Sequence, residues 1–166
     1  MLSIGCLKEN NDHDFRVSLT PETSKKLIKK NINVYVEEDC GIKSGFSNDD
    51  YSTVGVEILK TQESLIDKSD ILLSINPLDI DFNSISKNTK SKIFIGNFNF
   101  NNLVPDKRFT FLALEKIPRI ARAQSMDILS SQASIAGYQA SLLAANHLNK
   151  YFPMLITAAG TISPAK

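Results

Sequence analysis

Short apolar runs recur through the first two thirds of the chain, with helical or polar segments between them. The pattern predicts strands at residues 4–7, 34–36, 56–59, 71–75, 93–95 and 109–114. The run at 71–75 is almost continuously apolar, which is typical of a strand that is covered on both faces. Strands that alternate with helical patterns are typical of βαβ units. We therefore predict an α/β fold, a Rossmann-like (flavodoxin-like) parallel sheet with helices on both faces.

Capping signals place the helices of this region. Thr20, Pro21 and Glu22 predict a helix start with Thr20 as the N-cap, and the pattern ends near Asn31. The run Ser47-Asn48-Asp49-Asp50 is a capping-box pattern that opens a second, short helix. A third short helix is expected at 62–66, while residues 78–90 and the Asn-rich stretch 97–102 are expected to be connections or loop tips.

The last third of the chain has a different pattern. From about Gln124 to Leu148 there is no proline and only one glycine, so a long helix is predicted. At 100° per residue a stripe of small side chains falls within about 60°; it consists of Ala133, Gly137, Ala140 and Ala144. The opposite side carries Ile135, Tyr138 and Leu142, so one apolar side can pack on the sheet and the other needs a second partner.

These patterns suggest three segments of the chain. We expect a Rossmann-like N-terminal lobe at 1–122, a connecting or interface helix at 123–150, and the start of a link at 151–166. Because an exposed apolar helix face usually marks an interface, and two-fold homodimers are the commonest assemblies, we expect a homodimer.

Composition narrows the classes of partner. The chain has 166 residues and a net charge of +1, which gives no support to bulk nucleic-acid binding. The two cysteines, Cys6 and Cys40, make neither a disulfide framework nor a zinc spacing, so both are expected to be reduced and buried. An apolar run of transmembrane length is missing, so no direct membrane insertion is expected.

One stretch gathers polar chemistry where a strand has ended and a helix begins. It holds Arg119, Arg122, Gln124, Asp127 and Ser130. The free N–H groups and positive dipole end of a helix N-terminus suit an anion or an amide carbonyl. The structural alternative is that Asp127 caps the helix while Arg119 or Arg122 pairs with it. With only two histidines, His13 and His147, neither a metal site nor a histidine-based catalytic system is expected, and no G-x-G-x-x-G or Walker A motif is present.

The run from Arg119 to Tyr138 closely resembles the signature of the proton-translocating NAD(P) transhydrogenases, in the NAD(H)-binding component on their alpha subunit. The opening of the chain is similar to the same family, and so is its end. The residues that carry this similarity are Lys8-Glu9, Arg16-Val17, Leu19 to Glu22, Gly45 to Tyr51, Ala144 to Leu148, Phe152 to Met154 and Thr157 to Thr161.

The resemblance implies an oxidoreductase that transfers hydride between NAD(H) and an NADP(H) held on a separate component. A membrane-spanning component couples this step to proton translocation, and the NAD(H) component is a dimer of two-lobed chains. The family's pattern implies that Arg119, Asp127 and Ser130 hold the carboxamide and orient the nicotinamide. Gln124 would face the second nucleotide. No metal is implied, and the implied location is cytoplasmic or in an organelle matrix, peripheral to the inner membrane through the partner components.

Departures from the family pattern leave alternatives open. Asn76 stands where transhydrogenases usually have a basic residue, and Ser163 stands where proline is common. Alanine dehydrogenases share the fold but need a lysine and a histidine, which neither 74–77 nor 96–99 supplies. The alternatives are a dimerisation or assembly lobe without its own catalysis, and a lobe like those of alanine or saccharopine dehydrogenases.

In the family, the stretch similar to 161–166 leads into a lobe with a Gly-rich dinucleotide-binding turn. We therefore expect this chain to be a fragment, either an engineered piece or one product of a divided gene, and to be inactive by itself.

Overall fold

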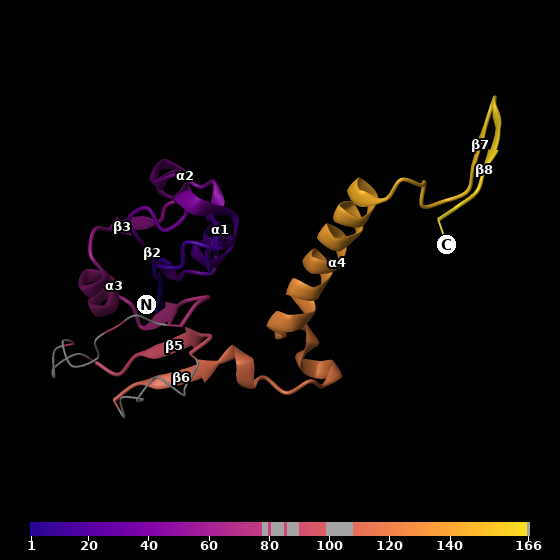
Figure 1. Ribbon diagram of the computed structural model, residues 1–166. Helices are drawn as coiled ribbons and strands as arrows, with labels where there is room; N and C mark the ends of the chain where they lie inside the picture. Colours follow the sequence, from indigo (N-terminus) through magenta and orange to yellow (C-terminus); the bar gives the residue numbers. More distant parts are fainter. Residues whose placement is uncertain (78–79, 81–84, 86–89, 99–107, 166) are drawn as a thin grey trace. The chain divides into compact units, whose positions relative to one another are not determined.

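The computed structural model describes residues 1–77, 80, 85, 90–98 and 108–165. The chain forms two compact units, Met1–Lys116 and Ile117–Lys166, and each is described by itself (Figure 1). Most residues of the expected connections at 78–90 and 97–102 lie outside the described part of the chain.

The first unit is built on a six-stranded sheet in which every pairing is parallel. Its strands are β1 (Ser3–Cys6), β2 (Asn33–Glu37), β3 (Glu57–Leu59), β4 (Ile71–Leu73), β5 (Ile93–Gly96) and β6 (Thr110–Ala113). The order is β3-β2-β1-β4-β5-β6, which is the order of Rossmann sheets, and it places the switch point between β1 and β4. The predicted parallel α/β sheet is thus confirmed.

Three helices of the first unit begin at side-chain caps. They are α1 (Pro21–Ile28), α2 (Asn48–Thr53) and α3 (Gln62–Lys68). Thr20 caps α1 in a capping box with Thr23, and Ser47 caps α2 in a capping box with Asp50. Both predicted helix starts are confirmed, because each cap side chain takes up an N–H group that the helix itself leaves without a partner.

Alternation along the strands divides the core between the two faces of the sheet. Val34 and Val36 lie in one cluster with Tyr51 and residues of α1, whereas Tyr35, between them, packs with α3 and Phe94 in the other. This alternation follows from the two-residue period of a strand and requires apolar cover on both faces. The predicted helices on both faces are therefore present.

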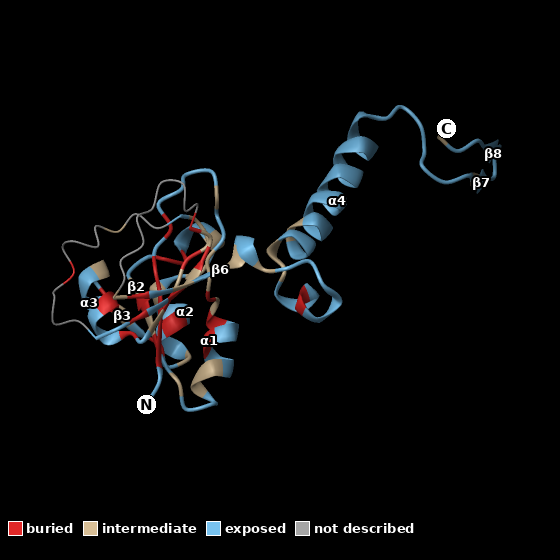
Figure 2. Ribbon diagram, turned by 90° about the horizontal axis from the view of Figure 1, so that it is seen from below, coloured by how far each residue is buried: buried red, intermediate tan, exposed pale blue. Residues whose placement is uncertain are grey.

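The second unit contains a short 3₁₀ helix at Ala121–Met126, the long helix α4 (Ile128–His147), and a hairpin of β7 (Leu155–Thr157) and β8 (Gly160–Ile162). The long helix begins at Ile128, later than the predicted Gln124, because Asp127 acts as its N-cap and the residues before it close a tighter turn. Within the described chain none of the α4 side chains is buried (Figure 2). Burial of its small-residue stripe stays a prediction.

Both cysteines are free and buried, as expected. Cys6 lies at the end of β1 and Cys40 follows β2, in the same apolar cluster as Tyr51. Among the described residues, no helix is both long enough and apolar enough to cross a bilayer.

Candidate functional site

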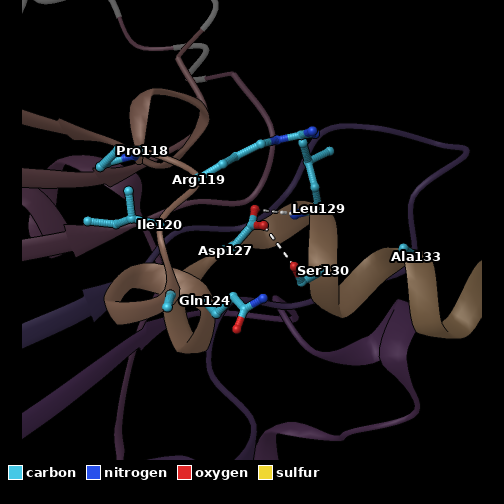
Figure 3. Close-up of a pocket in the computed structure, with 9 residues that line it drawn as sticks. Pro118, Arg119, Ile120, Gln124, Asp127, Leu129, Ser130 and Ala133 are labelled. Carbon is cyan, nitrogen blue, oxygen red and sulfur yellow. Dashed lines mark hydrogen bonds between the residues drawn. The ribbon is translucent and has the colours of Figure 1, made fainter.

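The second unit has a hollow of about 390 Å³ where the 3₁₀ turn meets the start of α4 (Figure 3). Four residues singled out in the sequence line it, namely Arg119, Gln124, Asp127 and Ser130. Apolar side chains complete the lining, which consists further of Pro118, Ile120, Ala121, Leu129 and Ala133. The structure therefore brings these predicted site residues together within one short segment of chain.

Asp127 is fixed in the lining of this hollow by two hydrogen bonds. Its Oδ1 accepts from the backbone N–H of Leu129 at 2.9 Å, and its Oδ2 accepts from the Ser130 hydroxyl at 2.8 Å (Figure 3). The Ser130 hydrogen bond, followed by the Leu129 N–H, holds the pKa of Asp127 below its ordinary value. The carboxylate is therefore ionised at neutral pH, and each of its oxygens keeps accepting capacity for a ligand.

The structural alternative for Asp127 is half confirmed. Asp127 caps α4, as that alternative requires. Among the described residues, however, no ion pair joins Asp127 to Arg119 or Arg122. Arg119 lines the hollow with an exposed side chain, whereas Arg122 does not line it. The two arginines, three residues apart, are thus placed differently, and Arg119 keeps a guanidinium that is available to a ligand.

A turn of backbone holds the lining residues in place. Ile120 N–H donates to the Pro118 carbonyl at 2.9 Å, and Ala123 N–H donates to the Ile120 carbonyl at 2.9 Å. Ala123 is the buried residue of this turn, at 8% exposure. Because its neighbours Arg122 and Gln124 are exposed, Ala123 anchors a turn that leaves the Gln124 amide free to face the hollow.

This set of groups suits the recognition of a planar amide. The Asp127 carboxylate accepts hydrogen bonds, Arg119 donates them, and the Gln124 amide does both. The apolar side chains of Ile120, Leu129 and Ala133 offer a surface for a flat ring. Among the described residues, no histidine, cysteine or lysine lines the hollow, so the arrangement fits binding and orientation rather than proton transfer by such groups.

The apolar part of the lining was missed in the sequence. Ile120 and Leu129 are exposed, and they could have been noted because they are large apolar residues inside an otherwise polar segment. Within the described part of the chain, no cluster of three or more His, Cys, Asp or Glu side chains could hold a metal ion.

Comparison with known proteins places the chain among relatives of two activities. It is 37% identical to a Rickettsia prowazekii protein named as the first section of a divided NAD(P) transhydrogenase subunit alpha, over 99% of this chain and 45% of that protein. It is 34% identical to the NAD(P) transhydrogenase subunit alpha of Cereibacter sphaeroides, over 99% of this chain and 32% of that protein. An alanine dehydrogenase of Methanococcus maripaludis is 27% identical, over 89% of this chain and 40% of that protein. The chain thus spans less than half of the length of these curated relatives.

Solved structures agree with the sequence relatives. The crystal structure of a transhydrogenase from Sinorhizobium meliloti superposes with a TM-score of 0.75 at 30% identity, over 98% of this chain and 50% of that chain. An L-alanine dehydrogenase, at 18% identity and a TM-score of 0.62, shares the fold over 98% of this chain and 46% of that chain. The family described as "Alanine dehydrogenase/PNT, N-terminal domain" matches residues 5–136, which include the hollow and the start of α4. The chain therefore belongs to the alanine dehydrogenase/PNT N-terminal domain family.

Proposed function

We propose that this chain supplies the N-terminal part of a transhydrogenase alpha subunit and contributes to hydride transfer between NAD(H) and NADP(H). One observation carries the proposal: Arg119, Gln124, Asp127 and Ser130 line a single hollow at the start of α4. Similarity to the alpha subunits of Rickettsia prowazekii and Cereibacter sphaeroides, over nearly the whole of this chain, supports the assignment to that subunit.

The donor and acceptor set fits the nicotinamide carboxamide. The ionised Asp127 would accept from the carboxamide NH₂, and Arg119 would donate to its carbonyl. The Ser130 hydroxyl holds Asp127 in place, and the Gln124 amide would face the second nucleotide. The dinucleotide supplies the hydride, and the residues of this chain orient the ring and keep apolar side chains against it.

Hydride transfer makes modest chemical demands on the protein. It needs two rings held at a near-attack distance with water excluded, and it needs no acid or base. A hollow lined by a carboxylate, an arginine, an amide and apolar side chains meets these demands without a histidine. NADP(H) would be held on a partner component, and a membrane-spanning component would couple the step to proton translocation.

The test compares two arginines in a reconstituted transhydrogenase that contains this chain. Arg119→Ala should lower single-turnover hydride transfer from NADH to an NADP analogue by on the order of a hundredfold, because misplacing a reacting centre by ~1 Å has that effect. Arg122→Ala is the matched control, since Arg122 is exposed and lies outside the hollow. Equal rates in the two variants would contradict the proposal.

The surface of α4 supports an assembly role beside catalysis. Its large apolar side chains are about half exposed or more, with Leu129 at 53%, Ile135 at 62% and Tyr138 at 69%. A row of such side chains on one helix is typical of an interface. We propose that a second copy of the chain covers part of this surface in a homodimer, with residues 125–150 at or near the interface. The assembly would be peripheral to the membrane, on the cytoplasmic or matrix side, through its partner components.

Alanine deamination is the alternative activity within the family. It would need a basic side chain and a histidine at the carboxyl edge of the sheet. The structure shows Asn76 at that edge, with its amide bound to Glu9 and Asp14, while position 97 is also asparagine and Asn99 lies outside the described residues. These contacts favour the transhydrogenase proposal.

A further inference from the structure

A cluster of polar side chains occupies the switch point of the sheet, far from the hollow in sequence. The loop that follows β1 and the loop that follows β4 meet there, because β1 and β4 are neighbours in the sheet. In open α/β sheets, ligands bind in the crevice outside the carboxyl ends of the strands at this point. We call the side chains that fill it the switch-point cluster, which consists of Glu9, Asn11, Asp14, Arg16 and Asn76.

Glu9 lies in this crevice as a bound carboxylate would. Its Oε1 accepts from the backbone N–H of Ile75 at 2.6 Å, and its Oε2 accepts from the backbone N–H of Asn76 at 3.0 Å. Glu9 is only 7% exposed, although glutamate is rarely buried. Two successive backbone N–H groups that point at one anion are the arrangement of an anion-binding nest.

Asn76 closes the crevice from the other side. Its side-chain nitrogen donates to Glu9 Oε2 and to Asp14 Oδ2, each at 3.2 Å, and its oxygen accepts from the Asn11 amide at 3.2 Å. Both N–H groups of this amide and its oxygen are therefore in use. Asn76 ties the two loops together and leaves no donor for an incoming ligand.

The cation of the cluster is also engaged. Arg16 Nε donates to Asp14 Oδ1 at 2.8 Å, and a terminal nitrogen of Arg16 donates to Oδ2 at 2.6 Å. This bidentate pair holds the pKa of Asp14 at about 2, so Asp14 is ionised over the whole neutral range. The fork of Arg16 is thus matched to a carboxylate of its own chain.

We propose that the Ile75 and Asn76 amides form a binding site for a small carboxylate, and that Glu9 fills this site from within the chain. Glu9 thereby acts as a specificity-determining residue: it excludes carboxylate substrates from the switch-point crevice and leaves ligand recognition to the hollow beside α4. The inference does not depend on hydride transfer, because it concerns only the first unit.

The shape of the site selects the ligand that tests this proposal. A cavity of only about 20 Å³ adjoins Glu9, with Leu7, Gln62 and Ser74 in its lining, which leaves room for about one water molecule. Replacing glutamate by alanine removes one methylene and the carboxylate, which together have the size of acetate. In the Glu9→Ala chain, acetate therefore fits the space that the side chain left, with its oxygens on the same two amides.

The experiment is a chemical rescue followed by thermal unfolding of the full chain. Glu9→Ala should lower the midpoint by roughly 5 to 10 °C, because two buried N–H groups lose their partner. About 200 mM sodium acetate should restore at least half of this loss, relative to sodium chloride of equal ionic strength. In ¹⁵N spectra of Glu9→Ala, acetate should shift the Ile75 and Asn76 amide resonances with a dissociation constant on the order of 10 mM.

Three chains serve as controls. The wild-type chain should gain nothing from acetate, since Glu9 already occupies the site. Glu9→Gln keeps the side-chain volume and should also gain nothing. Glu57→Ala removes a carboxylate whose partner, Lys68, is about half exposed, so acetate should not restore its stability. A gain from acetate in any of these chains equal to that of Glu9→Ala would overturn the proposal.

The test remains decisive if Glu9→Ala does not fold in chloride. In that case acetate should recover the circular dichroism of the folded chain, and chloride should not. Failure of acetate to do so, or equal recovery by both salts, would overturn the proposal. None of these results bears on hydride transfer, so the two proposals fail separately.

Discussion

Asp127 has two separable roles, and replacing it by asparagine tests them against each other. Its Oδ1 accepts from the Leu129 N–H as the cap of α4, and its charge is available to a ligand in the hollow. Asparagine is as good an N-cap as aspartate. In Asp127→Asn, the remaining oxygen can still accept from Leu129 N–H, and the Ser130 hydroxyl can accept from the new amide instead of donating. We therefore expect the helical circular dichroism and the unfolding midpoint to stay close to those of the wild-type chain.

The expected effect on hydride transfer is large. An acceptor that carries a charge binds a carboxamide donor more strongly than a neutral one, and losing such a hydrogen bond lowers a rate by roughly ten- to a hundredfold. Misplacing the ring adds to this loss. Asp127→Asn should thus lower single-turnover transfer from NADH to an NADP analogue in the reconstituted enzyme by on the order of a hundredfold, while NADH affinity falls much less.

The serines next to Asp127 provide a matched control. The Ser130 hydroxyl donates to Asp127 Oδ2, whereas the Ser131 hydroxyl donates to the Ile128 carbonyl and does not line the hollow. Ser130→Ala should therefore slow transfer and Ser131→Ala should not. Unchanged transfer in Asp127→Asn, or equal slowing in the two serine variants, would refute the reasoning and leave Asp127 as a helix cap only.

Three further predictions concern ligand binding, assembly and acid stability. The isolated chain should bind NADH weakly or not at all at millimolar levels in calorimetry, because it has no Gly-rich phosphate-binding turn; a dissociation constant near ten micromolar would contradict this. Gly137→Leu, at a position where an added Cβ meets no atom within 4 Å in the single chain, should shift the chain toward monomer in light scattering with its helical signal kept, at a cost of about 1–3 kcal/mol in the dimer. Ala145→Leu is its control off the stripe, and a wild-type chain that is strictly monomeric at hundreds of micromolar would refute the dimer. Arg16 lowers the pKa of Asp14 from 3.8 to about 2, so ionised Asp14 stabilises the fold above pH 4 and this contribution is lost as the pH falls toward 2. Asp14→Asn should flatten the unfolding midpoint measured across this range, and an unchanged pH profile would count against the pair.

Local sequence signals predicted the elements well where one cap or one short apolar run decides them. Thr20 and Ser47 were identified as caps because the groups that satisfy the helix N-terminus lie three residues away. The alternating apolar positions of 34–36 indicated a strand for the same local reason. The start of α4 was placed too early, because Gln124 to Met126 have helical periodicity but close a tighter 3₁₀ turn before the Asp127 cap.

Features that depend on the order of strands could not be predicted in this way. Glu9 and Asn76 are 67 residues apart, and they meet only because β1 and β4 are neighbours in the sheet. The gathering of Arg119, Gln124, Asp127 and Ser130 was predictable, since all four lie within one segment. The different placement of Arg119 and Arg122 was not, because it depends on how the turn around Ala123 is wound.

The most direct test of the central claim is to locate bound NADH on the chain. Hydrogen exchange of the reconstituted enzyme should be measured with and without NADH. The account predicts that NADH slows amide exchange in residues 118–133, which carry the hollow, and leaves the switch-point loops at 7–18 and 74–77 unchanged. Protection of the switch-point loops with none at 118–133 would contradict the account.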